Sequence, residues 1–268
     1  MAASFVPLLL LFIIPSVPKT ALLFCFSFSA SLDFSCGSGH NRKRSISFSE
    51  HRGGAAMKES ESYEHFIKVE TLREEVQRTA AAHGFQQTLD ALSFAERCHA
   101  GQKRKGPARL PYIIHPLTMA SHAISLGLLE DDLLAAILLH DTCEDCGILP
   151  EELPVRPAAR EAVRLLSFSV LPGEERAAAK KRYFAQIPAN RIAAITKLLD
   201  RCNNLSYMVY GFSKEKMLDY IDETKRYVIP ILQYAKEHYR EYGNALFLIN
   251  YQMCSLLNSI QVLLERSL

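Results

Sequence analysis

The sequence predicts an all-α protein in one domain. Three observations lead to this class. From residue 59 onward, apolar residues recur at three- and four-residue spacing, with almost no strand alternation. Glycine, proline and polar clusters divide these periodic segments into lengths typical of helices. The chain has neither an internal repeat of roughly 20–50 residues nor a glycine-rich phosphate loop.

The first half of the folded region alternates helices with short breaks. A helix is predicted from Glu59 to Gly84, where the glycine ends it, and a second over Thr88–Ala100. Gly101–Pro111 is rich in Lys, Arg, Gly and Pro, which predicts a loop. A short helix then follows from about Pro116 to Leu126 and stops at Gly127.

The second half begins with a strongly apolar segment. Asp131 or Asp132 is expected to cap a helix over Leu133–Asp141. Pro230 is expected to interrupt the fourth of the helices that follow. These helices are predicted over Ala158–Ser167, Glu174–Gln186, Asn190–Met208, Ser213–Tyr242 and Ala245–Glu265.

Composition excludes several classes of protein. With 49% hydrophobic and 22% charged residues, the chain has an ordinary globular mix, which excludes wholesale disorder. Residues 1–56 hold five basic and two acidic side chains, so the remainder is nearly neutral despite the formal charge of +2. Because this remainder is nearly neutral, electrostatics give no reason to expect nucleic acid as a partner. The seven cysteines are odd in number and lack framework spacing, which indicates free thiols and a cytoplasmic location.

Residues 1–56 differ from the rest of the chain. The apolar runs Leu8–Ile14 and Ala21–Phe28 are both shorter than the roughly 20 residues of a membrane helix, and prolines separate them. A secretory signal would carry a positive amino-terminal region, which is missing. We interpret residues 1–56 as an extension resembling translated upstream sequence, with an export or membrane signal as the alternative. The folded domain is expected over residues 57–268, without membrane association.

Ionisable residues follow directly on the apolar segment. Leu133, Leu134, Ile137 and Leu138 form one stripe of a helix. Burying imidazole and carboxylates on the same stripe is costly unless a cation such as a metal ion neutralises them. The alternative is a helix that emerges into solvent after Leu139. If the helix extends that far, the ionisable residues that continue the stripe two turns later are His140, Asp141, Glu144 and Asp145.

Two other segments favour the metal hypothesis. His115 stands at a predicted helix start between apolar residues, and Asp200 directly follows an apolar run. Asn204 falls one turn beyond Asp200 on the same face. Two histidines and two aspartates would make a mixed nitrogen and oxygen ligand set that leaves positions open for water and phosphate oxygen.

The ordered motifs resemble the HD hydrolase domain of the RelA/SpoT alarmone enzymes over about residues 85–235. Because the chain stops where the long enzymes continue into a synthetase domain, it is more similar to the small stand-alone alarmone hydrolases. The motifs are His99-Ala100-Gly101-Gln102, Arg104-Lys105, Pro111-Tyr112-Ile113-Ile114-His115-Pro116-Leu117, Leu139-His140-Asp141-Thr142-Cys143-Glu144-Asp145 and Lys197-Leu198-Leu199-Asp200-Arg201-Cys202-Asn203-Asn204.

The resemblance implies an HD-domain helical bundle and a function. It implies one Mn²⁺ ion and a (p)ppGpp 3′-pyrophosphohydrolase, which releases pyrophosphate and GDP or GTP from a guanine nucleotide alarmone. Matching positions imply that Glu144 and Asp145 handle the attacking water, and that Arg104, Lys105 and Asn204 contact the nucleotide. The implied metal ligands are His115, His140, Asp141 and Asp200.

Alternatives remain open at this point. The substrate could be another nucleotide, such as NADPH or a dNTP, or the chain could be a nucleotide-binding regulator whose hydrolysis has decayed. The oligomeric state is also open. Three departures from the family pattern bear on substrate detail. Asn203 stands where the family has a histidine. The loop after Lys105 is longer than the common form and carries an extra arginine, Arg109. The segment Arg164–Phe168 lacks the family's usual Gly-Val-Thr-Lys-Leu-like sequence.

Overall fold

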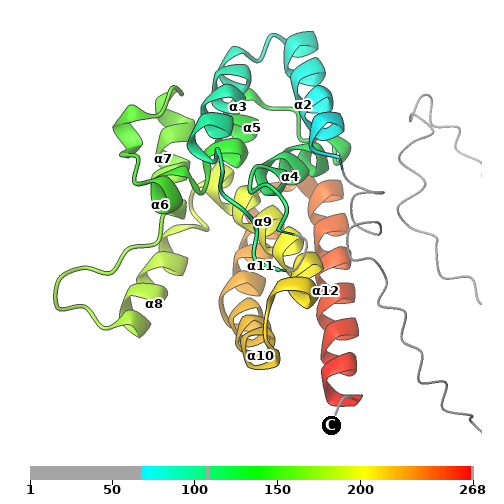
Figure 1. The fold of residues 1–268 in the computed structure, drawn as a ribbon. Coiled ribbons are helices and arrows are strands. Elements are labelled where there is room, and N and C mark those ends of the chain that lie inside the picture. The colour runs from blue at the N-terminus through cyan, green and yellow to red at the C-terminus, as the bar shows by residue number, and fades with distance from the viewer. Residues whose placement is uncertain (1–67, 107–108, 267–268) are drawn as a thin grey trace, which may run out of the picture. The chain divides into compact units, whose positions relative to one another are not determined.

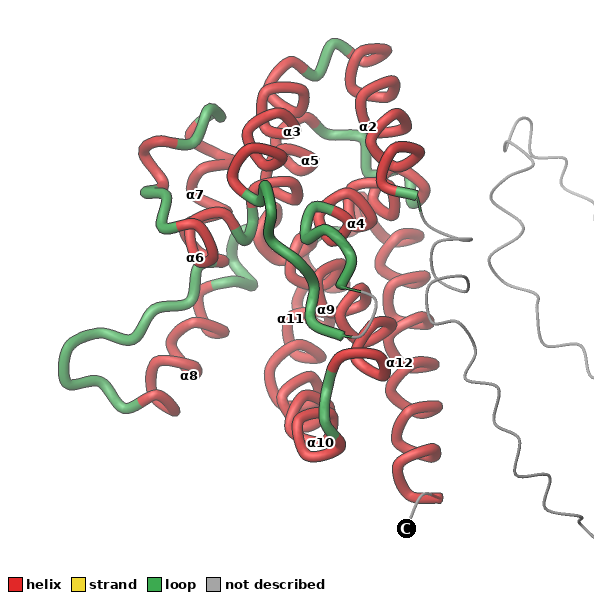
Figure 2. The backbone as a smooth tube through the Cα atoms, viewed as in Figure 1, coloured by secondary structure: helices red, strands yellow, loops and turns green. Residues whose placement is uncertain are grey.

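The structure, a computed structural model, describes residues 68–106 and 109–266, and all regular elements there are helical (Figures 1 and 2). Within these ranges the β pairing is limited to one isolated bridge, between Lys103 and Pro111. The all-α prediction is therefore confirmed. The predictions for residues 1–56, and for the start of the helix expected from Glu59, lie outside the described residues.

Short turns connect the helices. One π-helical turn, η3 (Thr224–Val228), and two 3₁₀ turns, η2 (Pro150–Glu152) and η4 (Arg240–Tyr242), lie between them. In chain order the α-helices are α2 (Val69–His83), α3 (Gln86–Cys98), α4 (Ile114–Ser125), α5 (Asp131–Leu139), α6 (Thr142–Cys146), α7 (Pro157–Leu166), α8 (Arg176–Gln186), α9 (Arg191–Gly211), α10 (Lys214–Glu223), α11 (Ile229–His238) and α12 (Gly243–Arg266).

Helix α9 is the central element of the described region. It packs against α4, α5, α7, α11 and α12 (Figure 1). Its first turn is capped by Asn190, whose side chain accepts a hydrogen bond from the backbone N–H of Ala193 at 2.9 Å. Ile195, Leu198 and Leu199 are fully buried, and each contributes about 1.5–3 kcal/mol by leaving water. Packing in the core therefore fixes the position of the side chains that α9 carries.

The aspartates at the start of α5, which were expected to cap that helix, connect it to α3 instead. The residue before α5 is Glu130, and neither Asp131 nor Asp132 caps the helix, so that prediction is wrong. Asp131 instead accepts bonds from the N–H and the hydroxyl of Thr88, at 2.9 and 2.7 Å. Burial of Thr88 explains the difference, because its polar groups need partners inside the protein.

The chain around Pro230 stays helical. The expected interruption takes the form of the π turn η3, which links α10 to α11 and places Pro230 in the first turn of α11. Proline has no N–H, and its ring clashes with the carbonyl four residues earlier in a regular α-helix. A wider π turn just before Pro230 relieves this conflict while the helix axis continues.

Helix α12 is long and apolar. The stretch Arg240–Arg266 passes the length and composition criteria for a membrane-spanning helix, with a hydropathy of 1.2. One face of α12, including Leu246, Ile249 and Met253, is fully buried in the core of the described region. Core helices of soluble proteins pass the same criteria, so this finding alone assigns no membrane contact.

The cysteines of the described residues are free thiols, as predicted. Cys202 is buried in the core, whereas Cys254 is exposed on α12. The other free cysteines are Cys98, Cys143 and Cys146.

Candidate active site

Three helices bring the predicted metal ligands together. His115 lies in the first turn of α4, His140 directly follows α5, and Asp200 lies midway along α9. Because α4, α5 and α9 contact one another pairwise, these three positions converge at one point. Asp141, the residue after His140, completes the group. We call His115, His140, Asp141 and Asp200 the His–Asp cluster.

The apolar stripe does not continue unbroken into the acidic residues. Helix α5 ends at Leu139, the φ of Asp141 shifts to −99° with a ψ of −6°, and α6 begins at Thr142. The buried hydroxyl of Thr142 donates to the carbonyl of Leu139 at 2.6 Å and stabilises this bend. The core-facing stripe could continue to Asp145 only if the helix extended that far. It does not, because the chain bends after Leu139 and leaves Glu144 and Asp145 exposed, as the alternative interpretation had it.

Donor atoms in the cluster lie within a few ångströms of one another. The ligand atoms of His115, His140 and Asp141 all fall within 4.8 Å. Nε2 of His140 is 3.0 Å from Oδ2 of Asp141, and Nε2 of His115 is 3.5 Å from the same oxygen. Oδ1 of Asp200 lies 3.3 Å from Nε2 of His115 and 4.0 Å from Nε2 of His140. Four donors thus surround one small volume.

Hydrogen bonds on the far side of each imidazole show that the cluster fits a cation. Nδ1 of His140 lies 2.8 Å from the carbonyl oxygen of Ile137, and Nδ1 of His115 lies 2.6 Å from Oδ1 of Asn203. Both partners are acceptors, so both Nδ1 atoms carry a proton and both Nε2 atoms face the carboxylates. The buried Nε2 of His140 is left with Oδ2 of Asp141, 3.0 Å away, as its nearest polar atom in the cluster. Two imidazole nitrogens that face two carboxylates form a ligand set suited to a divalent metal ion.

The ionisation of the cluster reflects its tight packing. Burial lowers the pKa of His115. Burial alone would also lower the pKa of His140, but the carboxylates of Asp141 and Asp200 outweigh it and raise that pKa to about 9. Burial opposes ionisation of Asp141 as well, yet the nearby imidazoles hold its pKa well below its usual range. With a pKa of about 9, His140 is protonated on Nε2 as well as on Nδ1 at neutral pH.

Asp200 is held by two further side chains. The ammonium of Lys197 lies 3.0 Å from Oδ2 of Asp200, and the amide of Asn204 donates to Oδ1 at 2.5 Å. Although burial opposes the charged form, Lys197 keeps the pKa of Asp200 well below its ordinary value. Sequence reasoning gave no role to Lys197, although it precedes Asp200 by one helical turn and so had to lie on the same face.

Tyr112 is a second residue that sequence reasoning missed. Its hydroxyl donates to Oδ2 of Asp141 at 2.5 Å. Burial, together with the carboxylates of Asp141 and Asp145, raises the pKa of Tyr112, so its hydroxyl stays a donor at neutral pH. The only available signal was its position three residues before His115 in a motif already quoted for the family resemblance.

The two acids on α6 lie at the surface beside the His–Asp cluster. Glu144 and Asp145 are both exposed, unlike the neighbouring His140. The carboxylate of Glu144 accepts a hydrogen bond from the backbone N–H of Phe168 at 3.1 Å. Partial desolvation raises the pKa of Glu144, and the Phe168 N–H opposes this only in part. A carboxylate with a raised pKa is a better proton acceptor than one with the ordinary value.

Arg104 connects the basic loop to the cluster. Its guanidinium donates to Oδ1 of Asn204 at 3.0 Å, and Asn204 in turn donates to Asp200. The same guanidinium lies over the rings of Tyr207 and Tyr112, at 4.7 and 5.8 Å from their centroids. We call Glu144, Asp145, Arg104 and Lys105 the acid–arginine rim. The side chain of Lys105 is exposed.

Two glycines hold the basic loop against the end of α9. A Cβ on Gly211 would stand 2.8 Å from the backbone oxygen of Lys105. A Cβ on Gly106 would stand 3.0 Å from the backbone oxygen of Tyr210, and the φ of Gly106 is +121°, which favours glycine. Only glycine permits so close a contact of the two backbones at both places.

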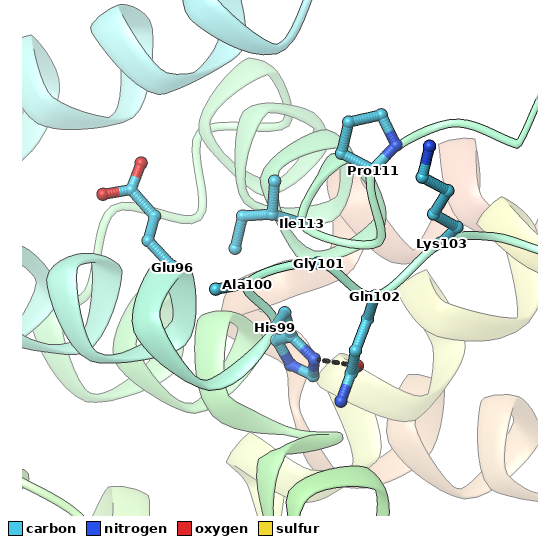
Figure 3. A pocket seen from close by; sticks show the side chains of 8 residues that line it. All are labelled: Glu96, His99, Ala100, Gly101, Gln102, Lys103, Pro111 and Ile113. Atoms are coloured by element: carbon cyan, nitrogen blue, oxygen red, sulfur yellow. Dashed lines mark hydrogen bonds between the residues drawn. The ribbon is translucent and has the colours of Figure 1, made fainter.

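A separate cavity of about 340 Å³ lies beside the start of this loop (Figure 3). His99 and Gln102 form part of its wall and are joined by a hydrogen bond of 2.8 Å, while Glu96 and Lys103 add charged side chains. None of the nine predicted site residues lines it. The cavity is therefore distinct from the candidate site.

Comparisons with known proteins agree with this geometry. A family model described as HD domain matches residues 91–166, which include His115, His140 and Asp141. A solved structure of a metazoan ortholog of SpoT, described as hydrolysing ppGpp, superposes with a TM-score of 0.53 and 20% identity. The likeness covers 65% of this chain and 94% of that one. At this identity the structure supports the fold alone, and fold and family model together define an HD-domain protein.

Relatives define the family more closely. A protein of Xenopus tropicalis named guanosine-3′,5′-bis(diphosphate) 3′-pyrophosphohydrolase MESH1 is 33% identical over 49% of this chain and 77% of its own length. The human protein of the same name is 32% identical over 51% and 79%. A 3′-pyrophosphohydrolase of Aquifex aeolicus is 33% identical, but only 20% of its length is matched. The chain belongs to the HD-domain hydrolase family that contains the MESH1 proteins.

Proposed function

We propose that this protein is a divalent-metal-dependent hydrolase of guanosine-3′,5′-bis(diphosphate) that releases the 3′-pyrophosphate and leaves GDP. The observation that carries the proposal is the pair of buried Nε2 atoms, on His115 and His140, turned toward two carboxylates. The names of the MESH1 relatives support the substrate. The exposed acids of the acid–arginine rim, which lie next to this pair in sequence and structure, support hydrolysis.

The ion proposed for the His–Asp cluster is Mn²⁺. Its ligands would be His115, His140, Asp141 and Asp200, a mixed set that suits this metal. When bound, the ion supplies Lewis-acid polarisation of the phosphoryl group and lowers the pKa of water. The protein's own part is to hold the four donors: Tyr112 orients Asp141, and Lys197 with Asn204 orients Asp200.

Glu144 and Asp145 are proposed to manage the proton of the attacking water. Glu144 is suited to accept it, because its raised pKa brings proton affinity closer to neutral pH. Water adds to the phosphorus joined to the 3′-oxygen, the bond from that phosphorus to the 3′-oxygen breaks, and the released 3′-oxygen takes up a proton. Asp145, beside Tyr112 at the same edge, would orient the water.

Arg104, Lys105 and Asn204 are proposed to bind the nucleotide. Arginine presents a planar fork of donors that matches phosphate oxygens, whereas lysine acts as a point charge. Arg104 is already placed between Tyr112 and Tyr207, so little of its freedom remains to be lost on binding. Asn204 links this guanidinium to Asp200 and thereby sets the distance between the nucleotide contacts and the His–Asp cluster.

The same proposal extends to the organisation of the chain. Residues 57–268 would form the hydrolase domain, and residues 1–56 a separate extension whose status is tested by mass spectrometry of the native amino terminus. A cytoplasmic location would match the free thiols of the described region. Nucleic acid and membranes are not proposed as partners.

One experiment tests the function directly. The purified protein is incubated with Mn²⁺ and ppGpp, NADPH or a dNTP, and the products are resolved by ion-exchange chromatography. We expect GDP and pyrophosphate in equal amounts from ppGpp, and no reaction in excess chelator. If ppGpp stays intact while NADPH is dephosphorylated or the dNTP is hydrolysed, the proposed substrate is wrong.

A further inference from the structure

The two histidines of the His–Asp cluster are oriented in different ways. His140 is bonded at Nδ1 to the backbone carbonyl of Ile137, three residues earlier in its own segment. His115 is bonded at Nδ1 to the side chain of Asn203, 88 residues away on α9. A substitution cannot remove a backbone carbonyl, but it can remove an amide. The orientation of His115 therefore depends on one replaceable side chain.

The Asn203 bond fixes both the tautomer and the ring of His115. An amide oxygen only accepts hydrogen bonds, so Nδ1 of His115 must carry the proton and Nε2 must present its lone pair. The short Nδ1–Oδ1 distance of 2.6 Å also restricts rotation of the ring. With the ring in this position, Nε2 lies between Oδ1 of Asp200 and Oδ2 of Asp141, at 3.3 and 3.5 Å.

Asn203 lies on the same helix as one of the proposed metal ligands. Asn203 is half-buried, on the same helix as Asp200 and three residues further along. One helix thus carries a proposed metal ligand and the residue that orients a second ligand on α4.

We propose that Asn203 is a positioning residue, which holds His115 in the tautomer and orientation needed to bind the divalent ion. Metal affinity in this chain then depends on an acceptor oxygen at position 203. The inference rests on the metal centre of the proposed function, but not on the identity of its substrate. Outer partners of metal-bound histidines typically contribute about 10–100-fold to metal affinity.

The test compares variants that keep or remove the acceptor. Asn203→Leu keeps the approximate shape without an acceptor, Asn203→Ala removes the side chain, and Asn203→Asp keeps an oxygen at the same place. Ser206→Ala is the matched control, because Ser206 is exposed on the same helix and its hydroxyl bonds only the backbone carbonyl of Asn203. Dissociation constants for Mn²⁺ are measured by competition with a fluorescent chelator.

Loss of the acceptor should weaken Mn²⁺ binding by about 10–100-fold in Asn203→Leu and Asn203→Ala. Asn203→Asp should bind Mn²⁺ at least as tightly as the unaltered protein, and Ser206→Ala should match it. Thermal unfolding of the metal-free proteins identifies any variant that fails to fold, and the remaining variants then decide. The inference is wrong if folded Asn203→Leu and Asn203→Ala proteins bind Mn²⁺ as tightly as the unaltered protein. It is also wrong if Asn203→Asp weakens Mn²⁺ binding as much as Asn203→Leu does.

Turnover separates positioning from general damage. At limiting Mn²⁺ the Leu variant should be less active, and at saturating Mn²⁺ its kcat should return close to that of the unaltered protein. A kcat that stays low at saturating Mn²⁺ contradicts a positioning role. An unaltered protein that binds Mn²⁺ but leaves ppGpp intact would refute the proposed substrate while leaving the role of Asn203 standing.

Discussion

The His–Asp cluster and the acid–arginine rim are adjacent in space but are built differently. The cluster lies where α4, α5 and α9 meet, and His115 and His140 are 2% and 4% exposed. The rim comes from the short helix α6 and from a loop, and Glu144, Asp145 and Lys105 are exposed. Close packing holds the first region, whereas a few hydrogen bonds and two glycine contacts hold the second.

This difference indicates that the two regions have different tasks, metal binding in the cluster and proton transfer with nucleotide binding in the rim. A metal site needs several donors within a few tenths of an ångström of fixed positions, which a packed core provides. Proton transfer and nucleotide binding need groups that reach solvent and substrate, which loops and short helices provide. Substitutions in the cluster should therefore remove the metal, and substitutions in the rim should spare it. Four measurements test this separation.

The largest effect is expected from His140→Ala. It removes one of the four donors of the His–Asp cluster, so Mn²⁺ affinity should fall by more than the roughly 100-fold typical of outer partners, and turnover should become undetectable. Metal content is measured by atomic spectroscopy after dialysis. His238→Ala, an exposed histidine at the end of α11, is the control. Normal activity of His140→Ala after chelation and return of Mn²⁺ would refute the cluster assignment.

Glu144→Gln should lower kcat by about 10²–10⁴-fold, because a neutral amide cannot take a proton from water. Asp145→Asn should act in the same direction. Both variants should retain the metal content of the unaltered protein, since neither residue belongs to the cluster. Glu151→Gln, an exposed acid in η2, serves as the control. Metal loss in Glu144→Gln would show that the acids belong to the cluster and would remove the distinction between the regions.

Arg104→Ala should raise KM for ppGpp by roughly 10–100-fold, since hydrogen bonds to charged groups are worth about 1.5–3 kcal/mol. Lys105→Ala should raise KM less, because its exposed ammonium is free to move. Metal content should stay unchanged in both. Lys103→Ala, an exposed neighbour in the loop, should leave KM as it is. A fall in kcat without a change in KM would place Arg104 in the chemistry instead of the binding.

The smallest change per step, about tenfold for each pH unit, is expected in the dependence of metal affinity on pH. Because the pKa of His140 is about 9, its imidazole carries a proton at neutral pH that must leave when the ion binds. Mn²⁺ affinity should therefore rise about tenfold per pH unit between roughly pH 6.5 and 8.5, with about one proton released per ion. Calorimetry in buffers of different ionisation enthalpy measures this number. An affinity that does not change with pH would contradict the proton on His140.

The spacing of apolar residues along the chain predicted much of the fold but less of the site. Strong periodicity located α9 and α12 to within a few residues, because burial of one helix face is encoded in neighbouring residues. The resemblance supplied the four cluster residues, which the structure brings together.

Contacts between distant segments could not be predicted. Tyr112 reaches Asp141 across 29 residues, and Arg104 reaches Asn204 across 100. The bend after Leu139 was also missed, because it depends on a tertiary environment that takes the acids of α6 out of the core. Such pairings depend on how the helices pack, and the spacing of residues within one segment cannot predict them.

The glycine contacts also limit which substitutions the basic loop can accept. Gly106 and Gly211 hold the base of the basic loop against α9, and the bridge between Lys103 and Pro111 closes that base. A side chain at either glycine would push the two backbones apart, because its Cβ would stand within about 3.0 Å of a backbone oxygen of the other segment. Arg104, which lies between the bridge and Gly106, would then move relative to Asn204. The position of Arg104 is thus set in part by two residues that have no side chain.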